Sequence, residues 1–306
     1  GQTLREHRIE GHGSRRTVTV GGHMLMIKHA PIWGIEFDGD RGPLDAAAER
    51  VAARYEAAHQ PYRAAAARGA VVVHEGGIDS INTYDGMTFT LGMGLSHSRL
   101  NRFLAGLRGT PTGDALATIP YFAGLAFNGS PAIVLDVEVL ARVIDIMRAH
   151  PDDIAEAAVR DFVESDALGG SRPEATGDAL APRTDPELIG VASYLHHGLP
   201  AYAPDPMGDA DRAATAHPGD RAAQLATVLK LYAQRVAAHP PGARLLRTII
   251  EDRLPNKVEH YVNAITQREP GFRFDLARAQ AVLPCLALTA PWPTQAEAPD
   301  GPTRGG

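Results

Sequence analysis

The chain has 306 residues, of which 44% are hydrophobic and 22% are charged, and its formal net charge is −6. This composition is that of a folded globular protein and excludes a disordered chain. Because the 30 basic and 36 acidic side chains are spread along the sequence without a basic block, nothing in the charge pattern predicts a nucleic acid as partner.

The first part of the sequence predicts β structure. Residues 1–44 contain two apolar, β-prone runs, TVTV and HMLMI, on either side of Gly21-Gly22. A glycine pair between such runs favours a tight turn, so we expect a hairpin or a short sheet. Asp38 and Asp40 also form an Asp-x-Asp-x-Gly pattern, which faintly suggests calcium. The full twelve-residue calcium loop with its terminal glutamate is missing, and a solvated acidic turn is favoured.

Residues 45–75 are rich in alanine and predict helical structure. Pro61 lies inside this stretch and is expected to split or restart the helix, because proline lacks a backbone N–H. The second half of the stretch ends in the apolar run AVVVH, and Glu75 follows it directly. We therefore expect Glu75 at the end of a helix.

The next segment, HEGGIDSINTYDGMTFTLGMG at residues 74–94, combines acidic side chains, threonines and glycines. From Met87 onward apolar and polar residues alternate, which predicts a β-strand. Asp85-Gly86 is a strong signal for a hairpin turn, since glycine tolerates positive φ. On this interpretation Thr90 and Gly92 share one face of the hairpin, and the bare Gly92 leaves room for a ligand to lie against the backbone.

The rest of the chain is predicted to be mainly helical. Helical patterns occupy residues 96–107, 112–129, 130–150, 151–168, 220–239, 242–254 and 256–267. The fold class is therefore α+β and mainly α. We expect an N-terminal β-hairpin extension at 1–44, a main domain at 45–284 with a Gly- and Pro-rich loop or linker near 169–187, and a disordered tail at 285–306.

The residues of the 74–94 segment suit glycoside hydrolysis. That reaction needs a protonated carboxylic acid beside the leaving oxygen, and a second group that attacks carbon or activates water. Glu75, emerging from an apolar run, is a reasonable general acid because partial burial favours its neutral form. Asp85, on a solvent-facing turn, would stay ionised, and the Thr90 hydroxyl could hold the attacking water.

Glu75, Asp85 and the run from Thr90 to Gly94 resemble the Glu…Asp…Thr-x-Gly-x-Gly signature of phage-type lysozymes, a lysozyme-like superfamily. Thr90 follows Glu75 by 15 residues, as this signature leads one to expect. Where the family usually has a histidine after Gly-x-Gly, this chain has Leu95, and His97 comes two residues later. The resemblance implies a lysozyme-like fold with a small β-hairpin lobe and a helical lobe.

The same resemblance implies hydrolysis of the peptidoglycan glycan strand with inversion. Glu75 would be the acid, with Asp85 and Thr90 activating water. Tyr84, Gly92, Gly94 and His97 are expected to bind the substrate. Because Asp79 lies four residues beyond Glu75, it competes with Asp85 for the second role, and Asp85 is preferred for its place at the turn.

Three alternatives stay open beside this muramidase. The first is a non-catalytic lysozyme-like module of a phage tail or secretion system, and the second is a chitosanase-like hydrolase, which an acidic groove would favour. The third is a lytic transglycosylase, which is the better name if Glu75 acts alone.

Other motifs give weaker signals. His196-His197 is the only paired histidine, but no His-Glu-x-x-His pattern or third zinc ligand accompanies it, so helix-end histidines are favoured. The pair could alternatively line the substrate cleft together with Tyr202. No P-loop, dinucleotide fingerprint or nucleophile elbow occurs, and Cys285 is the only cysteine, within an apolar run. We expect no metal and no cofactor.

The expected cellular location follows from the substrate. No stretch approaches the roughly 18 apolar residues of a membrane span, and the polar start GQTLREHRIEGHG has no signal core. We expect synthesis in the cytoplasm without a signal peptide, then delivery to the periplasm or outside the cell. A phage lysis system, a contractile tail or a specialised secretion system would deliver it, with the terminal segments as docking elements for that apparatus.

Overall fold

The structure is a computed structural model. It describes residues 4–13, 15–28, 34–61, 63–64, 66–68, 77–83, 89–92, 97–164, 188, 191–192, 206–238, 258–259, 261–263, 265–266 and 269–279. The chain divides into two compact units, Gly1–Pro182 and Arg183–Gly306. The division falls within residues 169–187, the segment predicted as a loop or linker, which itself lies outside the described residues.

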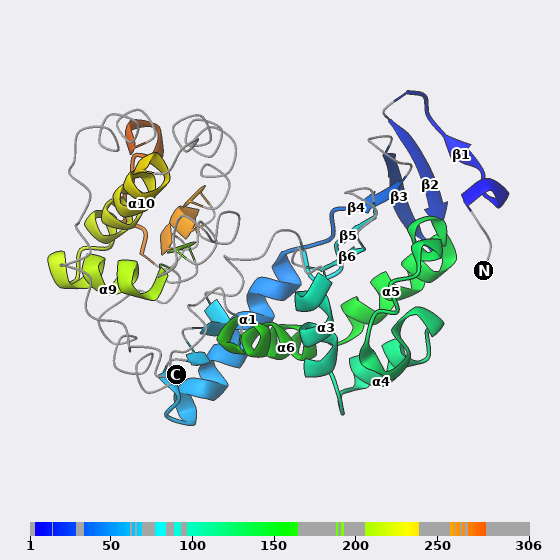
Figure 1. The fold of residues 1–306 in the computed structure, drawn as a ribbon, viewed down its shortest axis with the longest axis horizontal. Helices are drawn as coiled ribbons and strands as arrows, with labels where there is room; N and C mark the ends of the chain where they lie inside the picture. Colours follow the sequence, from blue (N-terminus) through cyan, green and yellow to red (C-terminus); the bar gives the residue numbers. More distant parts are fainter. Residues whose placement is uncertain are drawn as a thin grey trace. The chain divides into compact units, whose positions relative to one another are not determined.

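The first unit contains an antiparallel sheet whose six strands follow one another in chain order (Figure 1). The strands are β1 (Ile9–Glu10), β2 (Arg16–Val20), β3 (His23–Lys28), β4 (Gly34–Phe37), β5 (Ile81–Asn82) and β6 (Thr90–Leu91). Together with the predominance of helices, this sheet confirms the predicted α+β, mainly α class.

The hairpin of β2 and β3 forms where the sequence predicts it. Val20 pairs with His23, so Gly21 and Gly22 make a two-residue turn in which both have positive φ, 58° and 83°. Within the strands, Val18 and Leu25 are fully buried opposite each other. The alternation of buried and exposed side chains fixes the register, because a slip by one residue would turn the apolar set toward solvent.

The sheet also joins two β elements that the sequence predicts separately. Glu36 pairs with Asn82 and Phe37 pairs with Ile81, which places β4 beside β5. The buried Thr83 reinforces this junction. Its hydroxyl accepts from the Ile35 N–H at 2.8 Å and donates to the Val134 carbonyl at 3.0 Å. The N-terminal strands and the β5–β6 hairpin are therefore parts of one sheet.

Helices make up most of the remaining described residues of the first unit. They are α1 (Gly42–Ala57), α3 (His97–Gly106), α4 (Pro111–Ala117), α5 (Val137–Ala149) and α6 (Pro151–Glu164), with 3-10 turns at Leu4–Glu6, Pro120–Leu125 and Pro131–Leu135. In the second unit, α9 (Pro206–Ala216) packs on α10 (Arg221–Ala238). None of the described helices is both long and apolar enough to cross a membrane.

Prolines and capping side chains set several helix ends. Helix α1 ends at Ala57 and helical structure resumes at Pro61, as predicted. The helical pattern of residues 112–129 is interrupted, since α4 ends at Ala117 and a 3-10 turn begins at Pro120. Similarly, α5 does not begin at the Ser-Pro pair but at Val137, after the N-cap residue Asp136, whose carboxylate accepts from the Val139 N–H.

Helix α6 lies between α3 and α1, and two of its aspartates bind arginines on either side. Asp161 is 0% exposed and accepts from Arg99 at 2.8 Å and from Arg102 at 3.1 Å, both on α3. Near the other end, Asp152 is 34% exposed and accepts from two arginines of α1. Hydrogen bonding from Arg50 lowers the pKa of Asp152. The ion pairs of Asp152 therefore stabilise the fold above about pH 4, and this stabilisation is lost as the pH falls through the lowered pKa of Asp152.

The two aspartates give a matched test of burial. We expect Asp161→Asn to lower the free energy of unfolding by about 3 kcal/mol, because it breaks a buried ion pair and leaves the partly buried Arg99 without its counter-charge. Asp152→Asn, on the same helix and with the same number of arginine partners, should cost much less, because its ion pairs are exposed to water. Urea unfolding at neutral pH measures both, and equal losses would contradict this account of Asp161.

Candidate functional site

The structure describes part of the predicted site. Thr90 and Gly92 lie in the described hairpin, and His97 begins α3, although its side chain is not among the described ones. The remaining predicted residues lie outside the described ranges: Glu75, Tyr84, Asp85 and Gly94. Their roles stay predictions, and the structure describes the segments before and after them in the sequence.

Strand β6 turns Thr90 away from the core. Its neighbours Phe89 and Leu91 are buried, whereas Thr90 is partly exposed. Phe89 packs against Phe122 and Phe127, with ring centroids 5.6 Å and 5.4 Å away. Because successive side chains of a strand point to opposite faces, these two buried neighbours direct the Thr90 hydroxyl to the other face of the sheet. A partly exposed hydroxyl on a fixed strand suits the predicted water-holding role.

The register of β5 and β6 agrees with the predicted hairpin. Ile81 pairs with Leu91 and Asn82 pairs with Thr90, so each pair has residue 86 as its midpoint in the sequence. The sequence predicts the turn at Asp85-Gly86. The turn residues lie outside the described part of the chain, but the two strands that flank them are paired as a hairpin requires.

Gly92 approaches other parts of the protein closely. Its φ is +47°, and its N–H donates to the Ser80 carbonyl at 2.6 Å. A Cβ at this position would lie 3.0 Å from the carbonyl oxygen of Ile78 and 3.4 Å from Cε of Met147. The sequence predicts that a ligand lies against the backbone at Gly92. In the structure, the backbone of Ile78 lies there instead. Close packing alone therefore explains the glycine, and substrate binding by Gly92 stays a prediction.

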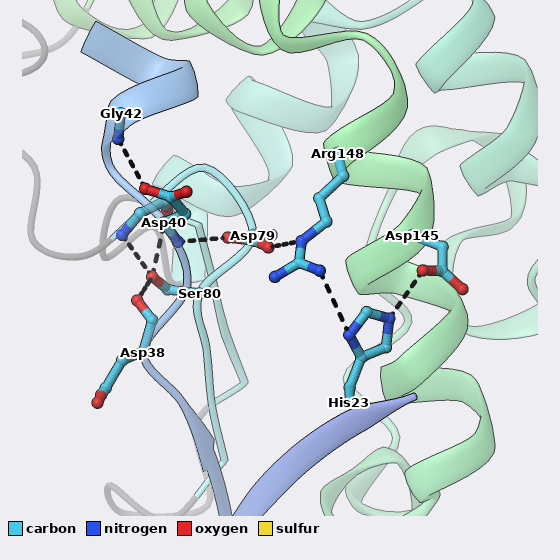
Figure 2. A network of polar contacts seen from close by, with 9 residues as sticks. His23, Asp38, Asp40, Gly42, Asp79, Ser80, Asp145 and Arg148 are labelled. Atoms are coloured by element: carbon cyan, nitrogen blue, oxygen red, sulfur yellow. Dashed lines mark hydrogen bonds and ion pairs between the residues drawn. The ribbon is translucent and has the colours of Figure 1, made fainter. Parts of the chain in front are cut away.

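The turn Gly77–Ser80 begins two residues after Glu75 and is held by the loop Asp38–Asp40 (Figure 2). The Ser80 hydroxyl contacts the Asp38 carbonyl and accepts from the Gly77 N–H at 2.6 Å, and the Ile78 N–H donates to the Asp40 carbonyl at 3.1 Å. A Cβ on Gly77 would lie only 2.4 Å from the backbone nitrogen of Asp40. The backbone just downstream of Glu75 is thus fixed by a close contact that only glycine permits.

Asp79 is a structural carboxylate in this turn. It is 0% exposed, accepts from the Asp40 N–H at 2.9 Å and forms an ion pair with Nε of Arg148. A buried carboxylate with these partners has neither the solvent access nor the free oxygen that water activation requires. This geometry favours Asp85 over Asp79 as the second carboxylate, and the role of Asp85 stays a prediction.

The loop Asp38–Asp40, which precedes α1, also has a structural role. The carboxylate of Asp40 accepts from the Gly42 N–H at 2.9 Å, which satisfies a donor at the start of α1. The Asp38 backbone carbonyl is used by the turn Gly77–Ser80. Among the described residues no group of three or more histidine, cysteine, aspartate or glutamate side chains could hold a metal ion. His196-His197 lies outside those residues.

A polar network extends from this turn to helix α5 and strand β3 (Figure 2). Arg148 of α5 binds Asp79 through Nε and reaches Nδ1 of His23 through Nη1 at 3.5 Å. Nε2 of His23 lies 2.7 Å from Asp145, one helical turn before Arg148. The sequence gives no signal that Arg148, His23 and Asp145 belong together. They form no local motif, and an arginine in the last turn of an amphipathic helix is common.

Comparisons of the chain with protein-family models, with curated proteins and with solved structures gave no significant match. The resemblance to phage-type lysozymes therefore rests on the signature from Glu75 to Gly94 alone.

The close approach at Gly92 generates a stability prediction. Gly92→Ala should be destabilising by about 2 kcal/mol or more, because it adds a clash with the Ile78 carbonyl to the cost of positive φ. Gly129→Ala is the matched control, since Gly129 also has positive φ, +72°, with nothing within 4 Å of its added Cβ. Denaturant unfolding of both variants checks this, and a Gly129→Ala loss as large as that of Gly92→Ala would contradict it.

Proposed function

We propose that the chain is a glycan-strand hydrolase of the lysozyme type that acts on peptidoglycan or a related amino-sugar polymer. One observation carries the proposal: Thr90 points away from the core, on a strand that is hydrogen-bonded to the turn that follows Glu75 in the sequence. This hydrogen bond is donated by the Gly92 N–H to the Ser80 carbonyl at 2.6 Å. The turn that follows Glu75 in the sequence and the strand that carries Thr90 are therefore hydrogen-bonded to each other.

The proposed chemistry assigns one role to each signature residue. Glu75 donates a proton to the glycosidic oxygen as the bond to the leaving sugar breaks. Asp85 accepts a proton from the attacking water, which Thr90 orients through its hydroxyl. Attack from the face opposite the leaving group inverts the anomeric centre. The structural role of Asp79 supports this assignment, because it removes the other carboxylate near Glu75 from consideration.

Substrate binding is proposed for the flanking residues of the signature. Tyr84 offers an aromatic ring, which sugars commonly stack on. Gly94 would allow close approach of the glycan to the backbone, and the same role is proposed for Gly92. His97 begins α3 just beyond them in the sequence. Peptidoglycan lies outside the cytoplasmic membrane, so this function places the action of the enzyme in the periplasm or outside the cell. Delivery by a phage or secretion apparatus is part of the same proposal.

Digestion of purified peptidoglycan tests the function directly. We expect the wild-type chain to release muropeptides with reducing ends, and Glu75→Gln to be slower by a factor of about 10² or more, because the amide cannot donate the proton. Mass spectrometry of the products measures both. Glu49→Gln is the control, since Glu49 is an exposed residue outside the signature, and its carboxylate pairs with Arg68 at 3.2 Å. It should digest peptidoglycan at the wild-type rate.

The products also separate the alternatives. Anhydro-muropeptides from the wild type would change the reaction to lytic transglycosylation at the same residue. If a folded wild-type chain releases nothing from peptidoglycan but cleaves chitosan, the chitosanase-like alternative replaces the muramidase. Release from neither polymer would contradict the enzymatic proposal and leave the non-catalytic lysozyme-like module.

A further inference from the structure

Arg148 contacts three parts of the first unit at once. Its Nε pairs with Asp79 of the turn Gly77–Ser80, and its Nη1 lies 3.5 Å from Nδ1 of His23 on β3. Its guanidinium carbon lies 5.4 Å from the ring centroid of Phe37 on β4. The preceding residue, Met147, packs against Gly92. In Figure 2 the Arg148 side chain lies between Asp79 and His23, which come from different elements.

The arginine cannot be exchanged freely at this position, because its partners use different parts of the guanidinium group. Only a planar group with several N–H donors can bind Asp79 through Nε and His23 through Nη1 while stacking on Phe37. His23 is orientated in turn from both sides. Nδ1 can accept from Arg148 when it carries no proton, and Nε2 then donates to Asp145 at 2.7 Å.

The ion pair of Arg148 with Asp79 determines which part of the structure the arginine stabilises. Asp79 is 0% exposed, so without Arg148 its charge would be buried with only the Asp40 N–H as donor among the described residues. An uncompensated buried carboxylate moves toward water or takes up a proton. Either change would alter the turn Gly77–Ser80, which begins two residues after Glu75 and accepts the Gly92 N–H. The side chain of Arg148 itself is 45% exposed and can rest in water.

We propose that Arg148 is a positioning residue for the hydrolysis: acting through Asp79, it holds the turn Gly77–Ser80, which follows Glu75 in the sequence, against the strand that carries Thr90. This inference rests on the proposed function. It also gives the N-terminal strands a part in the reaction, since His23 of β3 and Phe37 of β4 hold the arginine in place. Arg148 acts through Asp79 and is assigned no contact with the substrate.

The distance between the proposed acid and the attacking water, which Thr90 is proposed to hold, is the quantity that such a residue would control. An inverting glycosidase leaves room for one water between its two carboxyl groups, which lie about 6.5–9.5 Å apart. A displacement of about 1 Å in such an arrangement can lower the rate by about 10². Binding of the rest of the glycan depends less on this spacing. Loss of a positioning residue therefore lowers kcat more than it changes KM.

The test compares arginines of one helix. Arg148→Met removes the donors and keeps an aliphatic stem, whereas Arg148→Lys keeps a cation beside Asp79. Arg142→Met is the matched control, since Arg142 is on the same helix and donates to the Thr118 hydroxyl at 2.6 Å. We measure kcat and KM on soluble oligomers of alternating N-acetylglucosamine and N-acetylmuramic acid, with the folded fraction of each variant determined by circular dichroism at the assay temperature.

We expect kcat of Arg148→Met to fall by about tenfold or more while KM stays within about twofold. Arg148→Lys should recover part of kcat, because the ammonium keeps the ion pair with Asp79, and Arg142→Met should match the wild type. The proposal is overturned if Arg148→Met keeps the wild-type kcat, if its loss equals its unfolded fraction, or if the lysine variant is as slow as the methionine variant.

Amide hydrogen exchange provides a readout that does not need activity. In Arg148→Met the amides of Ile78 and Gly92, which donate to the Asp40 and Ser80 carbonyls, should exchange faster than in the wild type. They should not do so in Arg142→Met. If the wild type cleaves no glycan, the proposed function fails, and exchange alone then decides whether Arg148 holds this turn. Unchanged exchange in Arg148→Met would overturn the positioning role itself.

Discussion

The buried carboxylate of Asp79 is the interaction on which the region around the candidate site depends. It binds the backbone of the loop before α1 on one side and an arginine from the end of α5 on the other. A buried charge tolerates few arrangements of its partners, because every lost donor leaves a desolvated oxygen. The segments that supply those donors are therefore fixed relative to one another. Without the Asp79 carboxylate, the loop Asp38–Asp40 and the turn Gly77–Ser80 would be joined only by backbone hydrogen bonds and by the Ser80 hydroxyl.

Glycines make this arrangement possible at two points. A Cβ on Gly39, whose φ is +70°, would lie 2.5 Å from a carboxylate oxygen of Asp79. A Cβ on Gly77 would meet the backbone of Asp40 at 2.4 Å. The glycine-rich character of the 74–94 segment, which the sequence analysis connects with a ligand, thus has a structural cause at Gly77 and Gly92. A ligand-binding cause for the other glycines of the segment is compatible with it.

Local patterns in the sequence predict the local structure well. The Gly21-Gly22 hairpin, the restart at Pro61 and helix α10 lie where alternation, proline and apolar periodicity place them. The pairing of β4 with β5 was not predicted, since 44 residues separate Phe37 from Ile81 and no local signal records a long-range pairing. For the same reason, the sequence does not predict the network of Arg148, His23 and Asp145. Their significance depends on which buried group they meet, and only the tertiary structure shows that.

The pairing of β4 with β5 also affects the order in which the chain can fold. Strands β2 to β4 are joined by short connections and can pair early, whereas β5 must wait until residues 38–80 close a long loop with helix α1 inside it. Among the described residues, the β5–β6 hairpin has two paired residues in each strand, and an isolated two-stranded hairpin is at best marginally stable. The candidate site is therefore assembled late in folding, on an edge that the N-terminal strands have already prepared. A chain shortened to begin at the predicted domain boundary, residue 45, would lack that edge.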